Sequence, residues 1–142
     1  MIALDPAARF AFVPDLGNNA IFVYAFDGDT GQLVPDSEVS MPDGSGPRHM
    51  AFHSSGRFAF VLNELNNTVT TMAWVPTTGG LQPLGTTNLL FDDARARRLD
   101  RGGAAEIATS ADGRFVYTTV RLGRDVPPLA ATPAVPFGVE CN

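Results

Sequence analysis

Short apolar runs, each bounded by a turn, are the main pattern along this chain. The runs are rich in aromatic and β-branched side chains, a composition that favours strands. They lie at residues 9–13, 20–26, 57–62 and 68–75. Thr-Gly pairs at 30–31 and 78–79 mark turns before a further strand. No segment has the length and the 3.6-residue period of an amphipathic helix, so the pattern predicts an all-β protein.

The strand pattern repeats along the chain. The segment ALDPAARFAFVPDLGNN (3–19) aligns without a gap to AFHSSGRFAFVLNELNN (51–67), at a spacing of 48 residues. A third copy, EIATSADGRFVYTTVRLG (106–123), follows the second at a spacing of 57 residues. The nine extra residues fit within the charged segment 91–103, which we interpret as a loop insertion.

Four short strands in each repeat of about 45 residues are typical of a β-propeller blade. A β-sandwich of stacked hairpins would contain similar strands, but it would not explain a gapless repeat. We therefore predict propeller blades of four antiparallel strands, in repeats near 1–48, 49–104 and 105–124. A ring needs at least four blades. We expect this chain, with about two and a half blades, to be part of a longer propeller or to assemble with other copies.

Propeller topology predicts where the polar side chains gather. When strand A lies innermost and strand D outermost, the connections from D to A and the loops from B to C lie on the same face of the disc. We assign DGSGPRH (43–49) to such a connection and NELNN (63–67) to such a loop. Arg48, His49 and Glu64 are therefore expected to converge on one rim of the central channel.

Two sets of equivalent positions change their chemistry from copy to copy. They are Leu16, Glu64 and Arg121 in one set, and Met1, His49 and Glu106 in the other. A side chain that serves its own blade should recur in each copy, whereas one that serves a shared central site need not. We therefore select these positions as candidates for a site. On the repeat alone, Glu64 and Arg121 are equally well explained as exposed loop charges.

Other polar side chains have structural interpretations. An arginine precedes a phenylalanine in every copy, and we interpret these three as turn or inter-blade residues: Arg9, Arg57 and Arg114. His53 lies at the opposite end of strand A from the candidate site and is interpreted as a turn residue. The basic cluster RARRLDR (95–101) is interpreted as a solvated loop.

Composition narrows the classes of function. The net charge of −5 argues against nucleic acid or an anionic membrane surface as a partner. The single cysteine, Cys141, excludes a disulfide framework and fits a reducing compartment. The first residues lack the features of a signal peptide and no apolar run reaches a membrane span of about 18 residues, so we expect a cytosolic protein. No phosphate loop, Gly-x-Ser-x-Gly elbow or metal-spaced histidine pair is present, so we expect neither a cofactor nor a metal.

Four motifs resemble the lactonase family of seven-bladed β-propellers, which contains bacterial-type 6-phosphogluconolactonases and carboxy-cis,cis-muconate cyclases. They are DLGNN (15–19), GSGPRHMAFH (44–53), GRFAFVLNELNNTV (56–69) and AAEIATSADGRFVY (104–117). The resemblance implies a seven-bladed ring and a site that includes Arg48, Glu64 and Arg121. Beyond Tyr117 the sequence departs from the family pattern, and we expect the proline-rich tail 125–142 to be disordered.

The same resemblance implies hydrolysis of a sugar-acid lactone of the 6-phosphogluconolactone type or, alternatively, muconate lactonisation. A third alternative is a non-enzymatic binding propeller or an inactive fragment. In both enzyme hypotheses, Arg48 and Arg121 bind the anionic groups of a small lactone or muconate and stabilise the oxyanion. Glu106 belongs to the same substrate-binding set, and Glu64 or His49 would activate water or move a proton at carbon. The open blade edges are expected to favour self-association.

Overall fold

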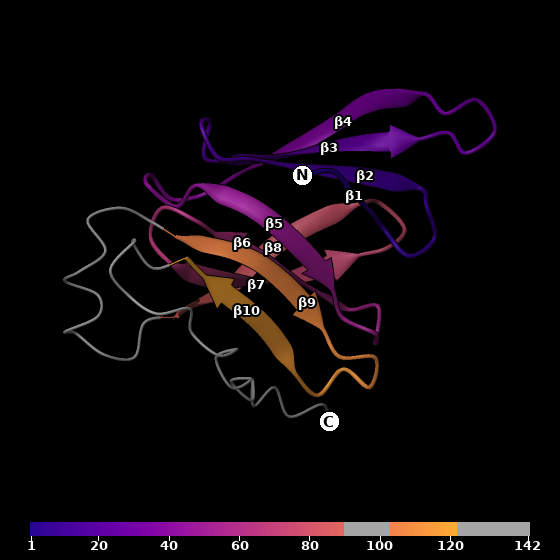
Figure 1. The fold of residues 1–142 in the computed structure, drawn as a ribbon. Coiled ribbons are helices and arrows are strands. Elements are labelled where there is room, and N and C mark those ends of the chain that lie inside the picture. The colour runs from indigo at the N-terminus through magenta and orange to yellow at the C-terminus, as the bar shows by residue number, and fades with distance from the viewer. Residues whose placement is uncertain (90–102, 122–142) are drawn as a thin grey trace, which may run out of the picture.

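The computed structural model describes residues 1–89 and 103–121 of the 142-residue chain. These residues form ten strands in three antiparallel sheets, which lie side by side in Figure 1 and confirm the all-β prediction. None of them forms a helix of the length and apolarity needed to cross a membrane. The basic cluster 95–101, the tail 125–142 and most of the proposed insertion 91–103 lie outside the described residues.

Each of the first two sheets is a blade of four strands in chain order. Blade 1 consists of β1 (Ala3–Leu4), β2 (Phe10–Asp15), β3 (Ala20–Phe26) and β4 (Leu33–Ser40). Blade 2 consists of β5 (Pro47–Phe52), β6 (Phe58–Asn63), β7 (Thr68–Val75) and β8 (Gly80–Asn88). Neighbouring strands are antiparallel throughout both blades, which confirms the predicted four-stranded unit.

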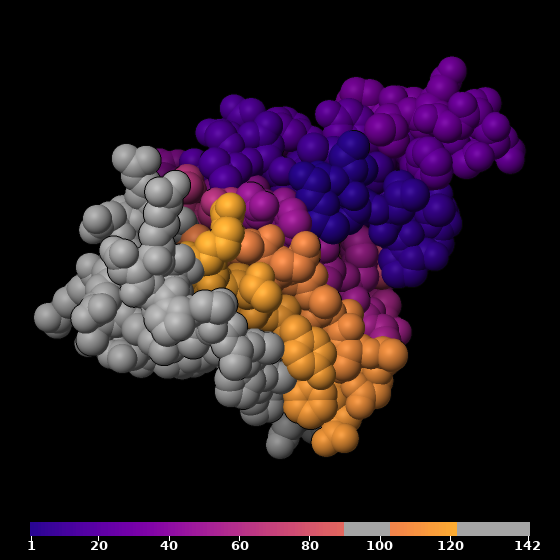
Figure 2. All heavy atoms as spheres, in the orientation of Figure 1, coloured from indigo at the N-terminus to yellow at the C-terminus, as the bar shows by residue number. Residues whose placement is uncertain are grey.

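Two strands represent blade 3 in the described part of the chain. They are β9 (Ala104–Thr109) and β10 (Val116–Val120), which pair antiparallel. Strand β9 packs next to β5 and β6 of blade 2. The space-filling view in Figure 2 shows residues 103–121 in direct contact with the body of the molecule. The first strands of adjacent blades are therefore neighbours, as they are around the axis of a propeller.

Apolar side chains fill the spaces between neighbouring blades. One core lies between blades 1 and 2 and includes Phe12, Ile21, Met50, Val61, Met72 and Trp74. A second core lies between blades 2 and 3 and includes Phe60, Leu62, Val69, Ile107 and Val116. Successive side chains of a strand point to opposite faces. Strand β6 therefore contributes to both cores, which explains why its sequence FAFVLN does not alternate between apolar and polar residues.

The repeated Asn-Asn pair links each blade to the next. Its second residue has a positive φ, 49° at Asn19 and 53° at Asn67, a conformation that asparagine tolerates better than most residues. The side-chain Oδ1 of Asn19 accepts a hydrogen bond of 2.9 Å from the backbone N–H of Gly46. Oδ1 of Asn67 accepts hydrogen bonds of 2.9 Å from the N–H groups of Gly103 and Ala104. The pair recurs because each copy holds the entry to the following blade.

The recurrent arginines and His53 occupy the turn positions that the sequence predicted for them. Nη2 of Arg9 donates to the carbonyl oxygen of Pro76 in blade 2, at 2.6 Å. The guanidinium of Arg57 lies over the ring of the phenylalanine that follows it, and so does that of Arg114. His53 hydrogen-bonds through Nδ1 to Ser55 within its own turn and through Nε2 to a blade 3 carbonyl oxygen. Both ring nitrogens of His53 therefore serve the scaffold.

Candidate active site

The connection between blades 1 and 2 and the turn between β6 and β7 meet at one rim of the blades. The backbone N–H of Glu64 donates to the carbonyl oxygen of Gly46 at 2.8 Å, and that of Leu65 donates to Ser45 at 3.1 Å. The predicted placement of these two segments on one face is therefore confirmed. One detail of the prediction is wrong, because Arg48 and His49 lie inside strand β5 rather than in the connection before it.

A β-bulge at Arg48 directs two consecutive side chains toward blade 3. Pro47 pairs with Asn63 and His49 pairs with Leu62, which leaves Arg48 as an extra residue on β5. In a regular strand, adjacent side chains point to opposite faces. Both Arg48 and His49 nevertheless contact blade 3. The bulge allows this, because an extra residue bends the strand and changes the direction of the side chains beside it.

Blade 3 carries a bulge at the equivalent place. Glu106 pairs with Thr119 and Ala104 pairs with Val120, so Ala105 is the extra residue on β9. Nε of Arg48 donates to the carbonyl oxygen of Ala105 at 3.1 Å. The two bulges therefore face each other across the boundary between the blades.

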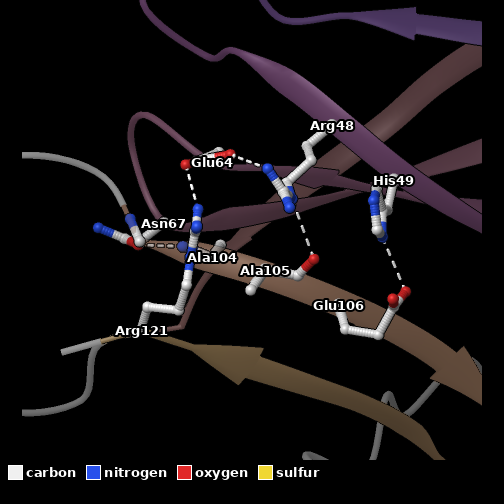
Figure 3. Close-up of polar contacts among 9 residues, drawn as sticks. Arg48, His49, Glu64, Asn67, Ala104, Ala105, Glu106 and Arg121 are labelled. Carbon is white, nitrogen blue, oxygen red and sulfur yellow. Dashed lines mark hydrogen bonds and ion pairs between the residues drawn. The ribbon is translucent and has the colours of Figure 1, made fainter. Parts of the chain in front are cut away.

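Glu64 holds two arginines together at this rim. Nη1 of Arg48 lies 2.7 Å from Oε2 of Glu64, and Nη2 of Arg121 donates to Oε1 of the same carboxylate, as Figure 3 shows. The Glu64 side chain is only 15% exposed, whereas those of Arg48 and Arg121 are 34% and 56% exposed. The carboxylate thus lies behind the guanidinium groups, which face solvent.

Arg121 occupies the position in blade 3 that Glu64 occupies in blade 2. The backbone N–H of Arg121 donates to the carbonyl oxygen of Gly103 at 2.6 Å, just as that of Glu64 donates to Gly46. The spacing from Glu64 to Arg121 and from Gly46 to Gly103 is 57 residues in each case. The structure therefore agrees with the equivalence that the repeat suggested.

His49 and Glu106 form a second polar pair at the same boundary. Nδ1 of His49 lies 2.8 Å from Oε1 of Glu106, which also accepts a hydrogen bond of 3.0 Å from the backbone N–H of Ile107. The hydrogen bond with His49, followed by that from Ile107, lowers the pKa of the Glu106 carboxyl below its ordinary value. Figure 3 shows the imidazole and the carboxylate facing each other, with Arg48 nearer to Glu64.

The charges at this rim favour a small anion. Arg48, Arg121 and Glu64 together carry one net positive charge. Each guanidinium has five N–H donors, and within residues 1–89 and 103–121 Arg48 uses two nitrogens and Arg121 one. Donors therefore remain for a carboxylate, phosphate or oxyanion. No group of three or more His, Cys, Asp or Glu side chains that could hold a metal ion occurs in the same described ranges.

The sequence identified equivalent positions but did not predict that they touch each other. All three polar contacts between blades 2 and 3 at this rim join equivalent residues: Arg48 with Ala105, His49 with Glu106, and Glu64 with Arg121. The constant spacing of 57 residues was the available signal. The bulges and the carbonyl oxygen of Ala105 had no signal in the sequence, because both depend on how two strands pair.

The fold and the rim define part of a β-propeller whose blades meet at a cluster of arginine, glutamate and histidine side chains. Residues 1–131 match the family described as "Lactonase, 7-bladed beta-propeller", and the chain belongs to that family.

Similar proteins include several lactonases. The chain is 31% identical over 116 residues to a 6-phosphogluconolactonase of Bacillus subtilis (strain 168), covering 82% of this chain and 32% of that protein. It is 34% identical over 123 residues to one of Pectobacterium carotovorum subsp. carotovorum (strain PC1), covering 83% and 35%. Among solved structures, the periplasmic gluconolactonase of Pseudomonas aeruginosa has a TM-score of 0.70 and 32% identity, covering 85% of this chain and 33% of that one. The chain thus spans about a third of the length of these relatives.

Proposed function

We propose that the propeller containing this chain hydrolyses the lactone of an anionic sugar acid, of the 6-phosphogluconolactone type. The observation that carries this proposal is the Arg48–Glu64–Arg121 bridge, which has one net positive charge and unused guanidinium donors at the rim. Membership of the lactonase family and similarity to proteins named 6-phosphogluconolactonase support the same class of reaction.

The two arginines would anchor the anionic group of the substrate. Their guanidinium groups are partly exposed, whereas the carboxylate of Glu64 lies behind them. A guanidinium fork matches the oxygens of a phosphate or carboxylate with two parallel hydrogen bonds. Because Glu64 fixes one end of each fork, less side-chain freedom is lost when an anion binds to the other end. We assign this anchoring role mainly to Arg121, the more exposed of the two.

Arg48 is the better candidate for stabilising the oxyanion. When water adds to the lactone carbonyl, negative charge develops on the carbonyl oxygen. A donor that is already held in position stabilises this charge without reorganising, and one such donor contributes about 2.7–4 kcal/mol. Arg48 is held at two points, by Glu64 and by the carbonyl oxygen of Ala105. Its remaining donors are therefore fixed in direction. Hydrolysis also requires a group that takes a proton from water, for which Glu64 and His49 are the two candidates at this rim.

Muconate lactonisation is the second candidate function. The same unused guanidinium donors suit a substrate with several carboxylates. The base would then move a proton at carbon instead of activating water. The difference between the two functions therefore lies in the substrate and not in the residues of this rim.

A substrate comparison on the complete gene product tests these proposals. One arm supplies 6-phosphogluconolactone and the other a carboxymuconate, with acid release and ultraviolet absorbance as the two readouts. We expect acid release above the spontaneous rate in the first arm alone. Conversion of the muconate instead would favour the cyclase, and turnover of neither substrate would contradict both enzyme functions. A binding platform would then be favoured if either compound still bound.

We also propose that the protein acts in the cytosol on a small anionic molecule. The single cysteine and the acidic net charge support this. The similar gluconolactonase of Pseudomonas aeruginosa is described as periplasmic, so the compartment needs its own measurement. Fractionation of cells that express the gene tests it, and recovery outside the cytosol would contradict the proposal.

A further inference from the structure

We infer that His49, oriented by Glu106, is the general base of the proposed hydrolysis, and that Glu64 is a positioning residue for the two arginines. This inference rests on the proposed function and divides the work between two carboxylates that are otherwise alike. Glu106 acts through the imidazole, and Glu64 acts through the guanidinium groups.

Glu64 is poorly suited to accept a proton. Each of its two carboxylate oxygens is occupied by a different guanidinium, from Arg48 at 2.7 Å and from Arg121. Protonation would weaken both ion pairs and leave two partly desolvated cations without their shared counter-charge. Breaking one partner of such a buried arrangement is costly because the other charge loses its compensation. The contacts of Glu64 therefore favour a permanently charged carboxylate.

His49 has the opposite arrangement. The Glu106 carboxylate is ionised at neutral pH and can only accept hydrogen bonds. The contact of 2.8 Å between them therefore requires that Nδ1 of His49 carries the proton. Nε2 is then left with a lone pair, and it has no hydrogen-bond partner within residues 1–89 and 103–121. A neutral imidazole in this tautomer is a general base.

Two features keep the imidazole in place. Glu106 is itself held by the backbone N–H of Ile107 at 3.0 Å, so the carboxylate that orients His49 is not free to rotate away. The other charged group beside His49 is Arg48 on the same strand, whose guanidinium is tied to Glu64 and Ala105. The His49 side chain is 20% exposed, which leaves its edge accessible to a water molecule.

His53 provides a contrast within the same strand region. Its Nε2 bonds to the carbonyl oxygen of Gly113 at 2.8 Å, and its Nδ1 bonds to Ser55 at 2.8 Å. With both ring nitrogens occupied by the scaffold, His53 has no lone pair to offer. The two histidines therefore differ in the one property that the reaction needs.

The proposed step conserves atoms and charge. A water oxygen forms a bond to the lactone carbonyl carbon while Nε2 of His49 takes one water proton. The resulting tetrahedral oxyanion is stabilised by Arg48. The bond from the carbonyl carbon to the ring oxygen then breaks, and the imidazolium returns its proton to that oxygen. The product is the open hydroxy acid, and His49 is neutral again.

The tautomer of His49 tests the orientation without any activity measurement. Long-range proton–nitrogen correlation spectra of the complete gene product, labelled with ¹⁵N-histidine, distinguish the two ring nitrogens when the imidazole is neutral. His49→Gln assigns the signals. We expect a proton on Nδ1 in the wild type and loss of this preference in Glu106→Leu. A proton on Nε2 in the wild type would overturn the inference whether or not the protein hydrolyses a lactone.

Kinetics test the division of roles. We expect His49→Gln to lower kcat by about 10²–10⁴-fold with little change in KM, and Glu64→Gln to act mainly on KM. Glu106→Gln should move the acidic limb of the kcat/KM profile to lower pH, because the protonated imidazole loses a neighbouring negative charge. His53→Gln is the matched control and should keep wild-type kinetics.

Three results would count against the inference. Normal kcat in a folded His49→Gln variant would overturn it, and so would loss of kcat at constant KM in Glu64→Gln. In both cases the proposed function would stand. A wild-type protein that hydrolyses no lactone would instead overturn the proposed function, and the base role with it. Thermal unfolding of each variant establishes that the kinetic effect does not come from unfolding.

Discussion

Arg121 donates a hydrogen bond to Glu64, and the two residues occupy the same backbone position in adjacent blades. The candidate site therefore lies at the boundary between two blades and does not belong to either of them. The same holds for His49 and Glu106. Any change that shifts blade 3 against blade 2 should affect the site, even when it leaves each sheet intact.

The first prediction concerns Arg48→Lys. We expect kcat/KM for the lactone to fall by roughly 10²-fold, because one ammonium group cannot bond Glu64 and the Ala105 carbonyl and also present a fixed donor. Steady-state kinetics of the complete gene product measure this. Arg57→Lys is the control, since Arg57 lies in a turn over its neighbouring ring. An equal loss in the control would contradict the distinction between site and scaffold arginines.

The second prediction concerns Asn67→Ala. The variant should lower the free energy of unfolding by about 2–4 kcal/mol, because the buried N–H groups of Gly103 and Ala104 both lose their acceptor. The positive φ of 53° adds to the cost, since alanine adopts it less readily than asparagine. Urea unfolding measures the effect. The exposed neighbour provides the control as Asn66→Ala, and equal losses in the two variants would argue against the inter-blade role.

The third prediction concerns Gly103→Ala. An added Cβ would lie 2.3 Å from the backbone carbonyl oxygen of Arg121, so this turn must move. We expect a loss of about 1–3 kcal/mol in stability and a higher KM, because Arg121 is displaced from Glu64. Gly85→Ala in β8 is the control, because its added Cβ would have no heavy atom within 4 Å. Unchanged KM in Gly103→Ala would show that Arg121 does not bind the substrate.

The fourth prediction concerns pH. The folded-state pKa of Glu106 is lowered below 4.5, so its contact with His49 stabilises the fold above that pH and is lost as the pH falls through the lowered value. Wild type should therefore be more stable than Glu106→Gln at neutral pH, and the difference should vanish in strong acid. The effect should be small, because the Glu106 side chain is 59% exposed. Thermal unfolding of both proteins across this pH range tests it. A difference that grows toward low pH would contradict the assigned sign.

The fifth prediction concerns the 142-residue chain made alone. Exposed apolar side chains such as Ile2, Leu4 and Tyr117 lie on its blades, and repeat units depend on their neighbours for stability. We expect the chain to associate and to show no lactone hydrolysis. Size-exclusion chromatography coupled to a hydrolysis assay measures both properties. A single monomer peak with turnover would contradict this expectation.

The sequence by itself determined the strands, their order and the roles of the scaffold residues. These are local properties: a strand shows a run of aromatic and β-branched residues, and a turn shows its glycine or asparagine. The repeat added the equivalence of Glu64 with Arg121, since a fixed spacing marks the same place in each blade. It also separated His53 from His49, because the two lie at opposite ends of β5.

Only the tertiary structure decided which polar residues touch. The bulge at Arg48 is a mismatch between two strands, so neither strand shows it alone. The pairing of His49 with Glu106 depends on how far blade 3 is rotated against blade 2, which the apolar core around Leu62 and Ile107 sets. Both Glu64 and Glu106 are single acidic residues in apolar surroundings along the chain. Their different partners in space, two guanidinium groups for one and an imidazole for the other, distinguish them.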